Sequence, residues 1–149
     1  MTTIAGKFYW TGTLPDDDDV ERAPEPIFSG DFGAQWQYMA TDPVIKNVCN
    51  GLRSQAMVSD MVDPSPEDHG WYTVFKFDGW TCFIYVQWVP DGNANNCFEF
   101  DVQLCHDWYH RIIHRSRYAN QIRALGSAVD KALASAADIE RVAFDQRAF

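Results

Sequence analysis

The feature that most constrains the fold is residues 71–89, which read WYTVFKFDGWTCFIYVQWV. In the middle, Asp78-Gly79 favours the positive φ angles of a two-residue hairpin turn. The turn fixes a register that pairs Phe77 with Trp80, Phe75 with Cys82, Thr73 with Ile84 and Trp71 with Val86. This stretch therefore predicts an antiparallel hairpin that places these eight side chains on one face.

The opposite face of this hairpin is also largely apolar, although a half-solvated strand normally alternates apolar with polar residues. It carries Tyr72, Val74, Lys76, Thr81, Phe83, Tyr85 and Gln87. Exposed aromatic patches on soluble proteins usually mark binding sites. We therefore expect this second face to be covered by a hairpin from the N-terminal part of the chain, by a second subunit in a homodimer, or by a partner protein.

Residues 97–104 (CFEFDVQL) follow a turn and predict a third strand of a meander. Phe98, Phe100, Val102 and Leu104 are expected to face the core, with Glu99, Asp101 and Gln103 outside. A solvent-facing role for Glu99 and Asp101 is the main interpretation. A carboxylate pair for acid–base catalysis is the alternative, because the spacing puts them about 6–7 Å apart along a strand.

Two further strands are expected in the N-terminal third of the chain. Residues 5–12 contain three consecutive aromatics, and residues 32–38 alternate apolar side chains with glutamines. The intervening segment carries Asp16 to Asp19 and several prolines, which indicate an exposed loop. We therefore predict an N-terminal hairpin with a long acidic tip.

A helix is expected to begin at Thr41 or Asp42, with Pro43 in its first turn. Its apolar residues recur at spacings of three and four, namely Ile45, Val48, Cys49, Leu52 and Ala56. Residues 106–146 are also predicted to be helical, with a break at Gly126-Ser127. The chain is therefore expected to be a single α+β domain over residues 1–149. In it, an antiparallel sheet of about five strands would pack against two or three helices.

Charge is unevenly distributed along the 149 residues, whose formal net charge is −9. Residues 1–104 hold 16 acidic and five basic side chains, whereas residues 105–149 hold five and seven. An acidic body repels phosphate backbones, so direct nucleic-acid binding is not expected. The N-terminus lacks a signal-peptide pattern, and no window approaches the roughly 18 apolar residues of a membrane span.

The four cysteines, Cys49, Cys82, Cys97 and Cys105, show no CxxC spacing. Cys49 and Cys82 fall on apolar faces, where a reduced thiol packs as a small hydrophobe. We therefore expect free thiols and a cytoplasmic protein.

His106, His110 and His114 share one face of the predicted C-terminal helix, because positions four apart stay within about 40° of one another. Such a face can hold zinc, but the set lacks further ligands and a glutamate between the histidines. If Trp108 and Ile112 face the sheet, the histidines point to solvent. A solvated face is therefore the main interpretation, and a metal site is the alternative.

Two charged segments are candidate contacts for a partner. The acidic run Asp16 to Asp19 with Glu21 lacks the spacing of a calcium loop and suits docking to a basic surface. The segment around Arg111 and Arg115 is basic and can bind an acidic group.

No motif of a nucleotide-binding loop or a hydrolase nucleophile occurs, so we expect no cofactor and no enzymatic activity. The composition is similar to that of toxin-immunity proteins, phage anti-defence proteins such as anti-CRISPR proteins, and acidic secretion chaperones. The expected function is an inhibitor that binds a basic protein stoichiometrically. Alternatives are a metal-dependent enzyme using the three histidines and a secretion chaperone or assembly protein. The expected contact residues are Asp16, Asp17, Asp18, Asp19, Glu21, Tyr72, Phe83, Tyr85, Arg111 and Arg115.

Overall fold

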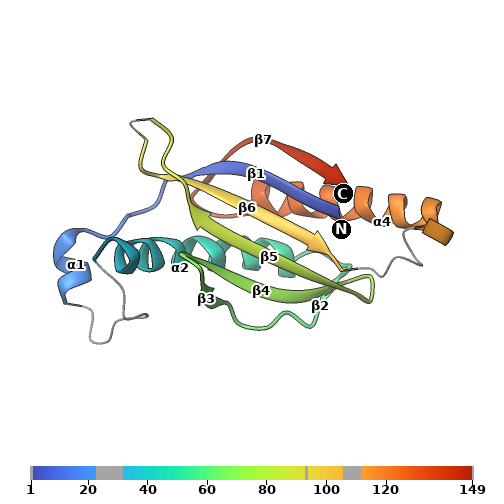
Figure 1. Ribbon diagram of the computed structural model, residues 1–149, viewed down its shortest axis with the longest axis horizontal. Helices are drawn as coiled ribbons and strands as arrows, with labels where there is room; N and C mark the ends of the chain where they lie inside the picture. Colours follow the sequence, from blue (N-terminus) through green and yellow to red (C-terminus); the bar gives the residue numbers. More distant parts are fainter. Residues whose placement is uncertain (1, 23–31, 93, 106–111, 149) are drawn as a thin grey trace.

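The computed structural model of the protein describes residues 2–22, 32–92, 94–105 and 112–148. Its elements in chain order are β1 (Thr2–Trp10), α1 (Asp17–Glu21), α2 (Phe32–Arg53), β2 (Val58–Ser59), β3 (Ser65–Glu67), β4 (Gly70–Phe77), β5 (Trp80–Trp88), β6 (Cys97–Leu104), α4 (Arg115–Ser135) and β7 (Ile139–Ala148). The strands form one seven-stranded antiparallel sheet in the order β2-β4-β5-β6-β1-β7, with β3 also paired to β4 (Figure 1). The α+β class is confirmed, and the sheet is larger than expected.

The two long helices, α2 and α4, lie on the same side of the sheet (Figure 1). Helix α2 packs on β4 and β5, α4 packs beside β7, and the helices contact each other. The core fills the space between helices and sheet, where Phe8, Phe75, Phe98, Leu52 and Leu125 are fully buried. Among the elements that the structure describes, no long helix lies on the opposite side of the sheet (Figure 1). Within the described residues, no helix is long and apolar enough to cross a membrane.

The central hairpin has the predicted register, with Phe77 opposite Trp80 and Thr73 opposite Ile84. Asp78 and Gly79 both adopt positive φ, 49° and 81°, as the two-residue turn requires. Strand β6 continues the meander, and its four predicted core residues are buried. This part of the fold follows from local turn chemistry and period-two alternation.

The predicted N-terminal hairpin is wrong, because residues 32–38 form the beginning of α2. Ala34, Tyr38 and Thr41 are buried together with Ile45, Val48 and Leu52. Their spacing of three to four places them on one helical face, and this face continues through Pro43. Four apolar residues at every second position fit a strand too, so the local pattern was ambiguous.

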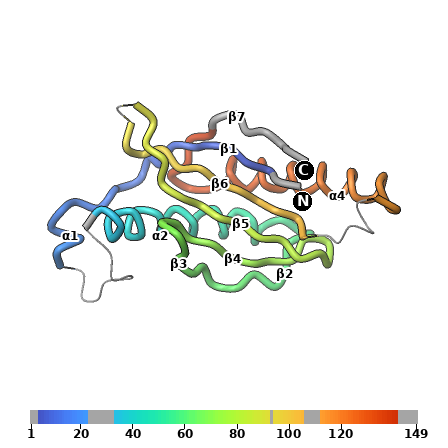
Figure 2. The backbone as a smooth tube through the Cα atoms, viewed as in Figure 1, coloured from blue at the N-terminus to red at the C-terminus, as the bar shows by residue number. Residues whose placement is uncertain are grey.

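The acidic stretch was expected to be a loop, but Asp17–Glu21 form the short helix α1. Strand β1 pairs with β6 on one side and β7 on the other, so it has no hairpin partner nearby in sequence. Thr2 pairs with Ala148, so the start of β1 lies beside the end of β7. Figure 2 shows the backbone of β1 running beside that of β6.

The last predicted helix is also corrected. Helix α4 runs through Gly126-Ser127 without a break and ends at Ser135, and residues 139–148 form the edge strand β7. Ile112, expected to face the sheet, is 58% exposed, and Trp108 lies outside the described residues. Strand β7 pairs with β1, whose residues lie more than 120 positions earlier in the chain. Local helical periodicity cannot reveal such a distant pairing.

Candidate protein-binding face

The side of the sheet without long helices forms a continuous surface, which we call the open sheet face. Its described members on the three central strands are the outward residues of the meander, namely Tyr72, Val74, Lys76, Thr81, Phe83, Tyr85, Gln87, Glu99, Asp101 and Gln103. Period-two alternation puts them there, because their neighbours Phe75, Ile84 and Val102 point into the core. No N-terminal hairpin covers this face, contrary to one of the expected arrangements.

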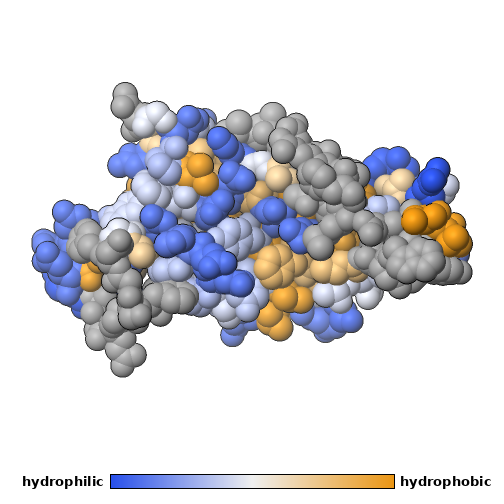
Figure 3. Space-filling view, in the orientation of Figure 1, coloured by the Kyte–Doolittle hydropathy of each residue, from blue (hydrophilic) through white to orange (hydrophobic). Residues whose placement is uncertain are grey.

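An aromatic cluster occupies the middle of the open sheet face. The rings of Tyr72 and Phe83 stack with centroids 5.2 Å apart and planes 24° apart. Tyr85 lies directly opposite Tyr72 in the β4–β5 register, and all three side chains are half-buried. In Figure 3, hydrophobic surface gathers over β4 and β5 and hydrophilic surface borders it. The structure thus brings together the three aromatic residues predicted from the sequence.

Tyr85 is anchored at one end of this cluster. Its hydroxyl donates a 2.5 Å hydrogen bond to the carbonyl oxygen of Asp68, in the turn between β3 and β4. The ring lies over Gly70, where an added Cβ would be 2.7 Å from the Tyr85 hydroxyl. Burial, together with Asp68, Tyr38 and Glu67, raises the pKa of Tyr85 to about 12. The Tyr85 hydroxyl therefore stays protonated beside the acidic side chains of Asp68 and Glu67.

The turn that receives this hydrogen bond is built from two residues with positive φ, Asp68 at 44° and His69 at 67°. The backbone N–H of His69 donates to the Tyr38 hydroxyl at 2.8 Å, and the two rings stack. Tyrosines from both sides of the sheet therefore hold the turn.

Two carboxylates border the aromatic cluster on β6. Asp101 lies directly opposite Tyr85, and Glu99 lies opposite Gln87. Both side chains are half-buried rather than fully solvated. Burial is the main cause that raises the pKa of Asp101; the nearby Glu99 raises it further, and a hydrogen bond with Gln103 lowers it. Apolar area and negative charge therefore meet on one face.

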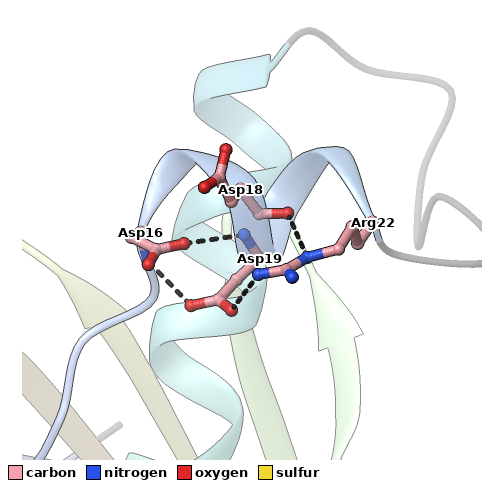
Figure 4. Close-up of polar contacts among 4 residues, drawn as sticks. All are labelled: Asp16, Asp18, Asp19 and Arg22. Carbon is pink, nitrogen blue, oxygen red and sulfur yellow. Dashed lines mark hydrogen bonds and ion pairs between the residues drawn. The ribbon is translucent and has the colours of Figure 1, made fainter.

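The acidic run predicted as a contact lies away from this cluster, beside the beginning of α2 (Figure 1). Figure 4 shows that Asp16 and Asp19 form a reciprocal capping box, with N–H to carboxylate distances of 2.8 and 2.9 Å. Arg22 contacts Asp19 at 3.6 Å and the Asp18 carbonyl oxygen at 3.2 Å. The carboxylates of Asp16 and Asp19 thus accept hydrogen bonds within this segment, and Asp19 also pairs with Arg22.

The other acidic side chains of this segment, Asp17, Asp18 and Glu21, are exposed and carry no described ion pair. They remain candidates for charge attraction at a distance from the open sheet face.

Of the basic and histidine candidates, Arg115 is exposed at the start of α4, and His114 is the N-cap residue of that helix, without a side-chain capping bond. Arg111, His106 and His110 lie outside the described residues. Among residues whose placement is described, no three His, Cys, Asp or Glu side chains are grouped as a metal site. The expected exposure of His114 agrees with the structure, although the helix phase used to derive it, with Ile112 inward, was wrong.

A groove that sequence reasoning did not find lies between the beginning of α2 and the end of β5. It measures about 650 Å³, and Trp36 and Trp88 meet there edge to face with ring centroids 4.9 Å apart. Their indole N–H groups donate to the carbonyl oxygens of Pro15 and Asn95, at 2.8 and 2.7 Å. The two tryptophans come from distant elements, and no sequence signal links them.

No protein-family model, curated protein or solved structure matches the chain.

Proposed function

We propose that this protein is a stoichiometric antagonist that binds a protein partner with a basic surface through its open sheet face. The observation that carries the proposal is the half-buried aromatic cluster of Tyr72, Phe83 and Tyr85, next to the carboxylates of Glu99 and Asp101. Aromatic residues are the commonest anchors of protein interfaces, and burying them against a partner is favourable. Fixed negative charge beside them selects a cationic partner.

Net charge supports the same choice of partner. At −9 the protein attracts cationic surfaces at long range and repels nucleic-acid backbones. The exposed carboxylates of Asp17, Asp18 and Glu21 add to this field beside the beginning of α2. We assign attraction to these residues and tight contact to the open sheet face.

A binder is proposed rather than an enzyme, because apolar area and fixed charge are means of recognition. An immunity or anti-defence protein is the proposed biological class, since such proteins act by occupying a partner's surface. The cytoplasm is the proposed location: Cys49, Cys82, Cys97 and Cys105 are all free thiols, as expected in a reducing compartment.

The test places a photo-crosslinking amino acid, p-benzoylphenylalanine, at Tyr72 of the full chain in its native host. The control position is Lys131, which is exposed on α4 behind the sheet. We expect Tyr72 to crosslink to one protein that Lys131 does not reach. The purified protein should then bind at a 1:1 ratio in calorimetry, with an affinity that falls at least tenfold from 50 to 500 mM salt. Equal crosslinking at both positions, or binding that salt leaves unchanged, would contradict the proposal.

A further inference from the structure

The groove between the beginning of α2 and the end of β5 lies on the helix side of the sheet. Trp88 continues the inward row of Ile84 and Val86 on β5, and its ring meets that of Trp36 from α2. The open sheet face, which carries Gln87, is on the other side of the same strand. A ligand bound in the groove would therefore not occupy the proposed docking face.

Hydrogen bonds fix the aromatic rings and one wall of the groove. The indole N–H groups of Trp36 and Trp88 both donate to backbone carbonyl oxygens of the chain itself. In the loop between β5 and β6, Asp91 and Ala94 exchange two backbone hydrogen bonds of 2.9 and 3.1 Å. The rings therefore offer their faces to a ligand, while their N–H groups are already engaged.

Negative charge lies at the rim of this apolar groove. Next to the two tryptophans, its lining includes Leu14, Pro15 and Pro90. Asp17 is the charged residue among the described lining residues; it is exposed, and its side chain takes no part in the capping box. Residues 23–31 contain two acidic side chains and no basic one. The described lining thus combines aromatic faces and a carboxylate with no basic side chain.

These properties suit an organic cation. A cation over a tryptophan face is attracted by the ring quadrupole, and tryptophan is the strongest aromatic partner. The planes of Trp36 and Trp88 stand at 68° to each other, so two differently oriented rings adjoin one groove. An anion is disfavoured, because Asp17 repels it and the indole N–H groups do not donate to it.

The kind of cation follows from the hydrogen bonds that it needs. A primary ammonium is strongly hydrated and carries three N–H donors, each of which needs an acceptor when water is displaced. A quaternary ammonium has no N–H donor, and its methyl groups can pack on the rings. The apolar lining therefore favours the quaternary group.

We propose that Trp36, Trp88 and Asp17 form a binding site for a quaternary ammonium group, carried by a small molecule or by a trimethylated lysine of another protein. The methyl groups would pack against the indole faces, and Asp17 would balance the charge from the rim. The groove volume of about 650 Å³ lies within the range of roughly 300–1,000 Å³ that is usual for small-molecule sites.

The experiment titrates the full-length, ¹⁵N-labelled protein with choline at constant ionic strength and follows the indole N–H signals by NMR. The control ligand is 3,3-dimethylbutan-1-ol, which has the shape of choline without its charge. We expect saturable shifts of the Trp36 and Trp88 signals at roughly millimolar choline. The alcohol should bind at least about fivefold more weakly. Trp80, which does not line the groove, is the internal reference and should not shift.

Two neighbouring substitutions test the carboxylate. Asp17→Asn should weaken choline binding by about threefold or more. Asp18→Asn is the matched control, because Asp18 is equally exposed and does not line the groove, and it should leave binding unchanged. Both substitutions preserve the capping box of Asp16 and Asp19, so both variants are expected to fold.

A third probe, the methylamide of Nα-acetyl-trimethyllysine, identifies the source of the quaternary group. Tighter binding of this probe than of choline supports a site for a methylated protein, and tighter binding of choline supports one for a small molecule. Three results would overturn the proposal: no shift of either tryptophan with both quaternary probes, equal binding of choline and the alcohol, or equal weakening by Asp17→Asn and Asp18→Asn.

Discussion

Gly51 of α2 and Ala132 of α4 lie so close together that a Cβ added to Gly51 would be 2.5 Å from the Ala132 carbonyl oxygen. The obstacle is backbone, which cannot rotate away as a side chain can. Gly51 thus lies where the two long helices contact each other.

Replacing Gly51 with alanine should therefore destabilise the protein, although the same change in an open helix stabilises by about 0.5–1 kcal/mol. Overpacking of this kind typically costs about 1–3 kcal/mol. Urea unfolding followed by circular dichroism measures the free energy of unfolding of each variant. Asn50→Ala, at the exposed neighbouring position, is the control and should change it by less than about 0.5 kcal/mol. A Gly51→Ala protein as stable as the control would show that the helices separate easily.

Tyr85→Phe should loosen the turn that contains Asp68 and His69. The change removes the hydrogen bond to the Asp68 carbonyl, which is worth about 0.5–1.5 kcal/mol. Two residues with positive φ then lose one of their anchors. Tyr72→Phe is the control, since its hydroxyl has no described partner. Similar losses in both variants would contradict the anchoring role.

The stability difference between the parent and Tyr85→Phe should also depend on pH. The pKa of Tyr85 is raised from 10.0 to about 12, so the folded state favours the neutral phenol. As pH rises above 10, the unfolded chain ionises first, and the stabilisation that Tyr85 provides is progressively lost. The difference in the free energy of unfolding between the parent and Tyr85→Phe, measured by urea unfolding, should therefore narrow between pH 9 and pH 11. A constant difference would contradict this.

Neutralising Asp17, Asp18 and Glu21 together should slow association with the crosslinked partner several-fold at low salt and leave dissociation unchanged. These substitutions, to Asn, Asn and Gln, preserve the capping box of Asp16 and Asp19. The matched control is Asp60→Asn, Asp78→Asn and Asp138→Asn, because asparagine tolerates the positive φ at all three positions. Stopped-flow kinetics compares the triple variants. If both triple variants slow association equally, the total charge of the protein, rather than the charge on α1, guides the encounter with the partner.

Cys105 should be the one thiol that reacts quickly with a disulfide reagent in the folded protein. It is exposed, whereas Cys49, Cys82 and Cys97 are buried. Burial raises the pKa of Cys49 to about 11 and that of Cys82 to about 12, so both stay protonated at pH 8. The coloured product released by the disulfide reagent should correspond to one reacted thiol per chain in buffer and to four in denaturant. Cys105→Ser is the control and should remove the fast phase; its persistence would contradict the assignment.

The sequence by itself determined the central meander and its outward residues. Asp78-Gly79 sets a turn whose geometry depends on two residues, and the alternation that follows fixes which side chains share a face. Tyr72, Phe83 and Tyr85 could be placed together for that reason. These relations are local, so neighbouring residues suffice to specify them.

Only the tertiary structure decided which secondary structure residues 32–38 and 139–148 adopt. The first fits a strand or a helix over four apolar positions, and it is helical as the beginning of α2, where Ala34 and Tyr38 are buried. The second becomes a strand because the free edge of β1 offers it backbone partners. The same long-range pairing of β1 with β6 puts Ala5 beside Asp101, so the environment of that carboxylate depends on residues almost 100 positions apart in the chain.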